Sequence, residues 1–262
     1  MNAPSAEERI AKGPVCAAHV ALFIMQDRTG SMVTGFPSGC ACSWQNSTDA
    51  LTAFVKDPAS AGLDVGLGYF GGLDKSKCDG SDCGQAVVPI QPIAMSCPAI
   101  VTAMNTNTNL PNPLSITPLE CGLRGMIDAC STYMAQSTTG ERCVTVLVTD
   151  GNTMDPTNCD PSVANMIQIV ADGHSKGVNT YTLGLQGSDP NFLDQIAQAS
   201  GTMAHIDASA GVQTFVSALN SIRQSITIKM TPSSVSRSER TTRAIADGVF
   251  RPSPSTAVAW PG

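Results

Sequence analysis

Two carboxylates stand at the ends of apolar runs in this sequence, and hydroxyl side chains follow the first of them. The run VALFIMQD ends at Asp27 and is followed by Thr29 and Ser31, while the run VTVLVTD ends at Asp150. Carboxylate and hydroxyl oxygens are ligands of hard divalent cations such as Mg²⁺. The sequence therefore predicts a cation site, provided that the two runs are neighbouring strands whose ends meet.

A further oxygen ligand is predicted at Thr117, which ends the loop NTNTNLPNPLSIT just before a strongly periodic helical segment. If neutral hydroxyls supply most of the direct ligands, the cation stays electrophilic and attracts a carboxylate from outside, which would make the site a binding device. Thr117 also has a structural interpretation, because Thr117, Pro118 and Glu120 form a T-P-x-E capping box. One hydroxyl could serve both purposes in different states.

The pattern of the chain supplies the strands and helices that would position these residues. Continuous apolar runs are typical of buried parallel strands, and prolines confine a strand to the sheet edge. The predicted strands are 20–25, 65–70, 85–93 (the edge strand with two prolines), 144–148, 180–185 and 203–206. Apolar stripes at helical spacing predict helices from about Ser47 or Thr48, from Pro118, after Asp160-Pro161, after Asp189-Pro190 and over 211–226. The alternation predicts an α/β fold: a doubly wound, mostly parallel sheet with helices on both faces, which binds ligands at the carboxyl ends of its strands.

This pattern covers residues 18–228 and indicates one domain. Residues 1–17 are interpreted as an N-terminal extension and residues 229–262, with five basic and two acidic residues, as a disordered basic tail. The net charge of −6 argues against nucleic acid as a partner. No apolar stretch is long enough to span a bilayer, and no signal peptide is recognised in this chain.

Ten cysteines are an unusual number for a cytosolic protein of this size. The even count predicts up to five disulfides and an extracellular, periplasmic or cell-surface location. A structural zinc site using Cys40, Cys42, Cys78 and Cys83 is the alternative, although no C-x-x-C pair supports it. Cys121 and Cys130 lie nine residues apart on one predicted helix, on opposite faces, so we expect that they do not pair with each other.

The motif Asp27-x-Thr29-x-Ser31, the single Thr117 and the strand-terminal Asp150-Gly151 resemble the von Willebrand factor A domain family over about residues 18–226. Cysteine-containing versions of this family are common in secreted bacterial proteins. The resemblance implies a metal-ion-dependent adhesion site that holds Mg²⁺ (or Mn²⁺ or Ca²⁺) and catalyses nothing. An acidic residue of a partner protein would fill the last metal position. It also implies a movable final helix, here 211–226. The family usually has serine where this chain has Thr29.

Two other functions remain open from the sequence. D-R-T-G-S also resembles the nucleophile motif of haloacid dehalogenase-type phosphotransferases, in which Asp27 would attack phosphorus while Asp150 and Asp155 hold Mg²⁺. That mechanism needs a lysine before the acidic motif, and none occurs between Lys77 and Lys176. The other possibility is a structural domain whose metal only stabilises the loops at the sheet rim.

Overall fold

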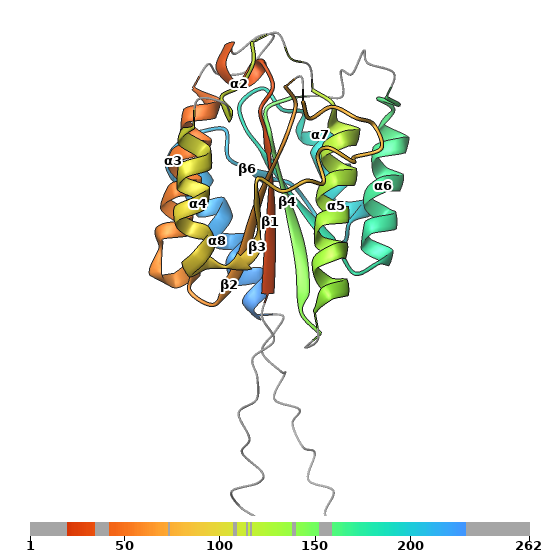
Figure 1. Cartoon of the computed structure of the whole chain (residues 1–262). Coiled ribbons are helices and arrows are strands. Elements are labelled where there is room, and N and C mark those ends of the chain that lie inside the picture. Colours follow the sequence, from red (N-terminus) through yellow and green to blue (C-terminus); the bar gives the residue numbers. More distant parts are fainter. Residues whose placement is uncertain are drawn as a thin grey trace, which may run out of the picture. The chain divides into compact units, whose positions relative to one another are not determined.

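A six-stranded sheet lies between two layers of helices in the computed structural model (Figure 1). The structure describes residues 20–34, 42–72, 74–106, 109–113, 115, 117–137, 140–151 and 159–228. The strands are β1 (Val20–Asp27), β2 (Leu63–Phe70), β3 (Val88–Pro92), β4 (Arg142–Thr149), β5 (Asn179–Gly184) and β6 (Ile206–Asp207). Their order is β3-β2-β1-β4-β5-β6, and only the edge pair β2–β3 is antiparallel. The predicted α/β architecture with a proline-containing edge strand is confirmed.

The helices divide between the two faces of the sheet. One face is covered by α3 (Ser43–Lys56), α4 (Ile93–Asn105) and α8 (Val212–Ile228), and the other by α5 (Leu119–Gln136), α6 (Val163–Ser175) and α7 (Pro190–Ala199) (Figure 1). Two short elements, α2 (Ser31–Thr34) and η1 (Pro58–Ser60), lie in the connections. The short α2 lies at the same end of the sheet as the carboxyl end of β1 (Figure 1).

Strand β1 is the centre of the molecule, and its side chains alternate between two hydrophobic cores. Val20, Leu22 and Ile24 pack into the core under α3, α4 and α8. Ala21, Phe23 and Met25 pack into the core under α5, α6 and α7. Because both faces of β1 are covered, every one of its residues is buried, which explains why its sequence is a continuous apolar run. This rigid strand carries Asp27 to the rim of the sheet.

Several predicted boundaries are wrong for local reasons. Helix α3 begins at Ser43 rather than near Ser47, and helix α4 was not predicted because Pro98 lies inside it and interrupts the helical pattern. The last strand is Ile206–Asp207 rather than 203–206, since Met203 has a φ of 84° and cannot continue a strand. The helix predicted after Asp160-Pro161 begins at Val163, and Ser162 caps it by accepting a hydrogen bond from the Asn165 amide.

Three disulfides join described residues: Cys78–Cys159, Cys83–Cys121 and Cys130–Cys143. The expectation that Cys121 and Cys130 do not pair with each other is confirmed. The zinc alternative is wrong, because Cys78 and Cys83 are bound in disulfides and cannot supply thiolates. Among the cysteines in the described ranges, Cys97 is a free, half-buried thiol.

We expect chemical reduction to lower the melting temperature by roughly 10 °C or more, because the three disulfides close sequence separations of 13, 38 and 81 residues. The measurement is thermal unfolding followed by circular dichroism with and without a reductant. Iodoacetamide in place of the reductant is the control. It modifies the free thiol of Cys97 and leaves the disulfides closed, so it should not lower the melting temperature to this extent. An unchanged melting temperature would show that the disulfides do not stabilise the fold.

The predicted extension 1–17 and the predicted basic tail 229–262 lie outside the described residues. None of the helices within the described ranges is long and apolar enough to cross a membrane.

Candidate metal centre

The register of the sheet brings the two strand-terminal carboxylates to one rim. β1 pairs in parallel with β4 from Val20–Arg142 to Gln26–Val148, so Asp27 lies one residue and Asp150 two residues beyond the last pair of these neighbouring strands. The relative exposures are 0% for Asp27, 1% for Thr29, 9% for Thr117 and 3% for Asp150, while Ser31 is half-buried. Asp27 and Asp150 therefore lie at the carboxyl ends of neighbouring strands, and four of the five predicted ligands are buried.

Asp27 is held by hydrogen bonds to both of its carboxylate oxygens. Oδ1 accepts from the Thr29 amide at 2.8 Å and from Thr29 Oγ1 at 2.6 Å. Oδ2 accepts from Thr149 Oγ1 at 2.6 Å. The hydroxyl proton of Thr29 is thus directed at Asp27. The lone pairs of Thr29 Oγ1 remain able to coordinate a cation or accept a hydrogen bond. Asp27 orients this hydroxyl rather than facing the rim itself.

Ser31 and Asp150 form the second half of the arrangement. Ser31 Oγ donates to Asp150 Oδ1 at 2.7 Å and lies 3.1 Å from Thr29 Oγ1. Because each hydroxyl donates to its own carboxylate at the shorter distance, no proton remains for the Thr29–Ser31 contact. Two oxygen atoms with facing lone pairs are an arrangement that a cation stabilises.

Thr117 joins the group from a third loop. Its Oγ1 lies 3.5 Å from Thr29 Oγ1, and a Cβ built on Gly151 would lie 2.9 Å from its methyl carbon. The capping alternative for Thr117 is wrong, since α5 begins at Leu119 without a side-chain cap. Glu120 instead accepts a hydrogen bond from the Asp160 amide at 3.0 Å and pairs with Arg124.

One carboxylate oxygen of Asp150 indicates that these residues fit a small divalent cation. Asp150 Oδ2 is buried and has no partner at hydrogen-bonding geometry in the described ranges, although the nearby Ser43 hydroxyl opposes the rise that burial causes in the pKa of this carboxyl. A buried carboxylate oxygen without a partner costs free energy that a bound cation would offset. Together with the hydroxyls of Thr29, Ser31 and Thr117, this oxygen supplies the all-oxygen donor set that Mg²⁺, Mn²⁺ or Ca²⁺ prefers.

The same burial changes the acidity of both carboxyls. Burial raises the pKa of Asp27, although its hydrogen bonds with Thr149 and Thr29 oppose the shift. Burial, and then the charge of Asp27, raise the pKa of Asp150 to about 7. Two buried carboxylates without a cation between them are therefore an unfavourable arrangement at neutral pH.

We expect the metal-free protein to lose stability as the pH rises from about 4.5 to 8. Unfolding returns Asp150 to a pKa near 3.8, so the folded state binds more protons than the unfolded state across this window. The free energy of unfolding therefore falls as the pH rises toward the folded pKa. The melting temperature should fall by roughly 5 °C, and Mg²⁺ should reverse the fall at pH 8 but have little effect at pH 4.5. Differential scanning calorimetry with EDTA or Mg²⁺ measures these melting temperatures.

A melting temperature of the metal-free protein that rises across the window would contradict this prediction. Acids whose pKa is lowered, such as Asp57 and Asp194, titrate below this window.

Two residues next to the predicted ligands were missed from the sequence. Thr149 fixes Asp27 and also accepts a hydrogen bond from the Gly151 amide at 3.0 Å. Arg28 is buried and donates to the Gly71 carbonyl at 3.1 Å, and it forms an ion pair with Asp74. A polar residue at the end of an apolar strand was the available signal for Thr149. Nothing local indicated the partners of Arg28, because they lie more than forty residues away.

The other acids near the rim have local structural roles. Asp189 caps α7, Asp160 accepts from the Ser162 amide, and Asp207 accepts from the Ser209 amide. Asp155, the second acid of the phosphotransferase alternative, lies outside the described residues.

The comparisons with known proteins concern the fold. No protein-family model and no curated protein matches the sequence. Among solved structures, the vWF domain of the type V pili tip protein Mfa5 from Porphyromonas gingivalis matches with a TM-score of 0.57 and 12% identity, covering 84% of this chain and 99% of that one. The chain has the von Willebrand factor A fold.

Two further structures with this likeness are larger than the matched region. The pilus adhesin SpaC from Lactobacillus rhamnosus GG matches with a TM-score of 0.58 and 15% identity over 82% of this chain, which spans only 31% of SpaC. Proximal thread matrix protein 1 from the mussel byssus matches with a TM-score of 0.55 and 14% identity over 79% of this chain and 48% of that protein. The resemblance to von Willebrand factor A domains that the sequence indicated is thus confirmed for the fold.

Proposed function

We propose that this von Willebrand factor A domain is a divalent-metal-dependent protein-binding domain. Asp27, Thr29, Ser31, Thr117 and Asp150 would hold Mg²⁺ (or Mn²⁺ or Ca²⁺), directly or through water, and the cation would bind an exposed Asp or Glu of a partner protein. The observation that carries the proposal is the buried Oδ2 of Asp150, which has no hydrogen-bond partner among the described residues and lies beside three converging hydroxyls.

The charge balance of the site favours an external carboxylate. Both oxygens of Asp27 accept hydrogen bonds from Thr29 and Thr149, so Asp150 is the carboxylate with an oxygen left for the cation. A dication facing one carboxylate and neutral hydroxyls keeps positive charge. It therefore stabilises an acidic side chain that completes its oxygen shell.

The geometry supports binding rather than phosphoryl transfer. A nucleophilic Asp27 would need a free carboxylate oxygen with access to substrate. Asp27 is fully buried, and both of its oxygens are used in hydrogen bonds. We therefore infer that the chain is not an enzyme and that Asp27 positions the Thr29 hydroxyl.

The setting of the proposed function is outside the cytoplasm. Three disulfides among the described residues are typical of an oxidising compartment. Two of the structures that share the fold are a pilus adhesin and a pilus tip protein. We infer an adhesive role at a cell surface or in the extracellular space, consistent with the cysteine-containing secreted type.

The test combines metal binding with ligand competition. Calorimetric titration should show Mg²⁺ binding, and the immobilised protein should capture its partner from native cell surfaces with Mg²⁺ but not with EDTA. A short peptide with an exposed Asp should compete for capture, whereas the same peptide with Asn should not. Mg²⁺ binding that raises the melting temperature without any effect of acidic peptide or EDTA on capture would assign the metal a purely structural role.

A further inference from the structure

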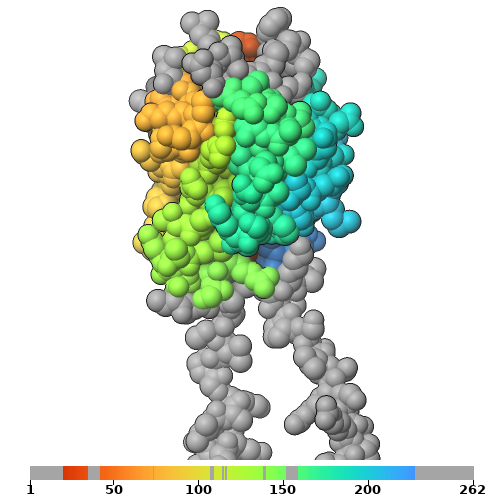
Figure 2. Space-filling view, turned by 90° about the vertical axis from the view of Figure 1, so that its right-hand side faces the viewer, coloured from red at the N-terminus to blue at the C-terminus, as the bar shows by residue number. Residues whose placement is uncertain are grey.

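One loop contacts the segment that carries Thr29 and is linked by disulfides to the helix that follows Thr117 and to Cys159, nine residues beyond Asp150. This loop, residues 71–87 between β2 and β3, is called the tethered loop below; it is described except for residue 73. Figure 2 shows it as an orange patch on the outer surface beside the yellow-green α5. Hydrogen bonds within the loop hold its conformation, because the Asp82 carboxylate accepts from the Ser76 and Lys77 amides at 3.1 and 3.2 Å.

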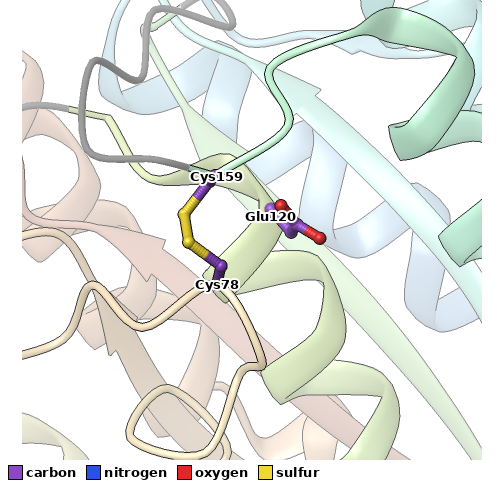
Figure 3. Close-up of side chains that lie close together, drawn as sticks. All are labelled: Cys78, Glu120 and Cys159. Carbon is purple, nitrogen blue, oxygen red and sulfur yellow. A yellow bond between two sulfur atoms is a disulfide. The ribbon is translucent and has the colours of Figure 1, made fainter.

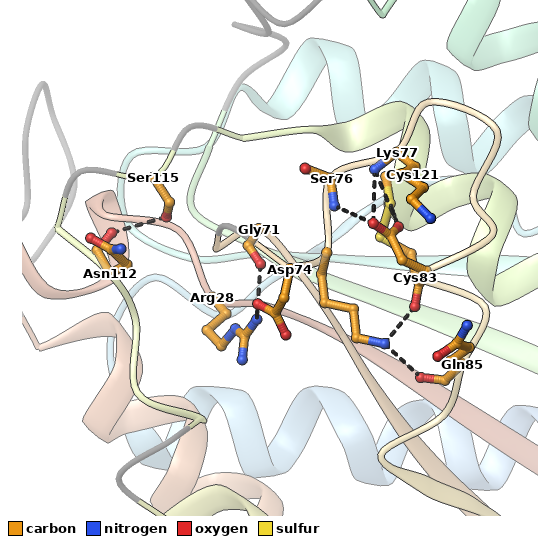
Figure 4. A network of polar contacts seen from close by, with 12 residues as sticks. Arg28, Gly71, Asp74, Ser76, Lys77, Cys83, Gln85, Asn112, Ser115 and Cys121 are labelled. Carbon is orange, nitrogen blue, oxygen red and sulfur yellow. Dashed lines mark hydrogen bonds and ion pairs between the residues drawn. A yellow bond between two sulfur atoms is a disulfide. The ribbon is translucent and has the colours of Figure 1, made fainter.

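The first contact joins the tethered loop to the motif that contains Thr29. Arg28 donates to the Gly71 carbonyl and pairs with Asp74 (Figure 4). A Cβ built on Gly71, whose φ is 84°, would lie 2.4 Å from the methyl carbon of Thr29. The methyl group that distinguishes threonine from serine at this position therefore packs directly on the loop.

The second link joins the tethered loop to the helix that follows Thr117. Cys83 forms a disulfide with Cys121 in the first turn of α5. A Cβ built on Gly125, one turn later, would lie 2.5 Å from the Cys83 carbonyl carbon. The loop and the start of α5 thus pack backbone against backbone, and the disulfide is four residues from Thr117.

The third link joins the tethered loop to the chain beyond Asp150. Cys78 forms a disulfide with Cys159, and Glu120 of α5 lies beside this bond (Figure 3). Glu120 also accepts from the Asp160 amide. These two sulfur atoms and the carboxylate are close enough to suggest a metal cluster, but sulfurs joined in a disulfide are not thiolate ligands.

We propose that the tethered loop is a positioning element of the metal centre, so that tight Mg²⁺ binding requires the Cys78–Cys159 and Cys83–Cys121 disulfides to be closed. This inference rests on the metal-binding function proposed above. Ligand loops that approach from three directions must keep their spacing for the small cation to be bound by all of them. Covalent tethers to one common loop supply that spacing.

The tethers differ in their accessibility to reductants. Cys78 is half-buried, whereas Cys83, Cys121, Cys130 and Cys143 are fully buried. Because thiol–disulfide exchange needs access to a sulfur atom, a dithiol reductant should open Cys78–Cys159 first among these three. The dithiol gives two electrons and two protons, closes to its own cyclic disulfide, and leaves Cys78 and Cys159 as thiols. The Mg²⁺ affinity of the site would then respond to the thiol redox state of its surroundings.

The experiment compares two disulfide deletions in the full chain. Cys78→Ala/Cys159→Ala removes a tether, and Cys130→Ala/Cys143→Ala removes a disulfide between the middle of α5 and the start of β4, away from the rim. Both variants are titrated with Mg²⁺ by calorimetry at a temperature at which circular dichroism shows both to be folded. We expect at least a tenfold loss of affinity in the first variant and less than a twofold change in the second. Mild dithiol treatment of the unmodified protein should reproduce the first result.

The outcomes separate this inference from the proposed function. Mg²⁺ binding by the unmodified protein together with unchanged affinity in the Cys78→Ala/Cys159→Ala variant would overturn the positioning role alone. An equal loss in both variants would also overturn it, since general loosening would then be the cause. If the unmodified protein does not bind Mg²⁺ at all, the metal-binding function itself is wrong.

Discussion

Replacing Asp150 by asparagine should lower the affinity for Mg²⁺ at least about 100-fold and raise the melting temperature of the metal-free protein at pH 8. The loss of affinity follows because, among the described residues, the buried Oδ2 of Asp150 has no hydrogen-bond partner and is the carboxylate oxygen at the site left for a cation. The gain in stability follows because burial, and then the charge of Asp27, raise the pKa of Asp150 to about 7, and the substitution removes this buried charge. A rise of roughly 5 °C corresponds to between one and a few kcal/mol for a domain of this size.

Calorimetric titration with Mg²⁺ and thermal unfolding in EDTA measure the two effects on one preparation. Asp207→Asn is the matched control, because Asp207 is an exposed acid at the same end of the sheet whose carboxylate accepts from the Ser209 amide. The control should change neither Mg²⁺ affinity nor metal-free stability appreciably. Retention of Mg²⁺ affinity in Asp150→Asn would remove this residue from the site.

Replacing Gly30 by alanine should destabilise the protein by about 1–3 kcal/mol and weaken Mg²⁺ binding at least tenfold. A Cβ at this position would lie 2.5 Å from the Pro113 carbonyl oxygen and 2.8 Å from its carbon. The clash is with backbone, so no side-chain rotation relieves it. The Gly30 amide also donates to the Ser115 carbonyl at 3.2 Å. The added methyl group should therefore displace the loop that leads to Thr117.

Gly62→Ala separates this effect from general destabilisation. Gly62 has a φ of 88° and no atom within 4 Å of a built Cβ, so alanine there costs backbone strain without a clash. This control should lower the melting temperature modestly and leave Mg²⁺ affinity unchanged. If Gly30→Ala bound Mg²⁺ as tightly as the unmodified protein, Thr117 would not be needed as a ligand.

Much of the fold could be predicted from the sequence, because local patterns of apolar and capping residues determine its strands and helices. The apolar runs that form β1 and β4 are continuous for the simple reason that both strands are covered on two faces. Asp189-Pro190 begins α7 as predicted, with Asp189 accepting from two helix amides. Helix α4 was missed because Pro98 is tolerated inside it, which packing against the sheet permits and local propensity does not indicate.

The candidate site likewise has residues that the sequence could predict and contacts that it could not. Residue types at two strand ends and one loop were enough to select Asp27, Thr29, Ser31, Thr117 and Asp150, and the structure places them together. Their role as metal ligands stays a prediction. The contacts of Gly71 with Thr29 and of Cys78 with Cys159 depend on long-range packing. No short pattern in the sequence encodes such contacts.

The direction of β1 has a mechanical consequence for the proposed adhesive role. β1 runs from Val20 to Asp27, and its carboxyl end lies at the same end of the sheet as α2, where the candidate metal ligands gather (Figure 1). It is paired along its length with β2 on one side and β4 on the other. A pulling force between a bound partner and the polypeptide before Val20 would act along this strand and load its two hydrogen-bond ladders in shear. Ladders loaded in that way must break together rather than one bond at a time.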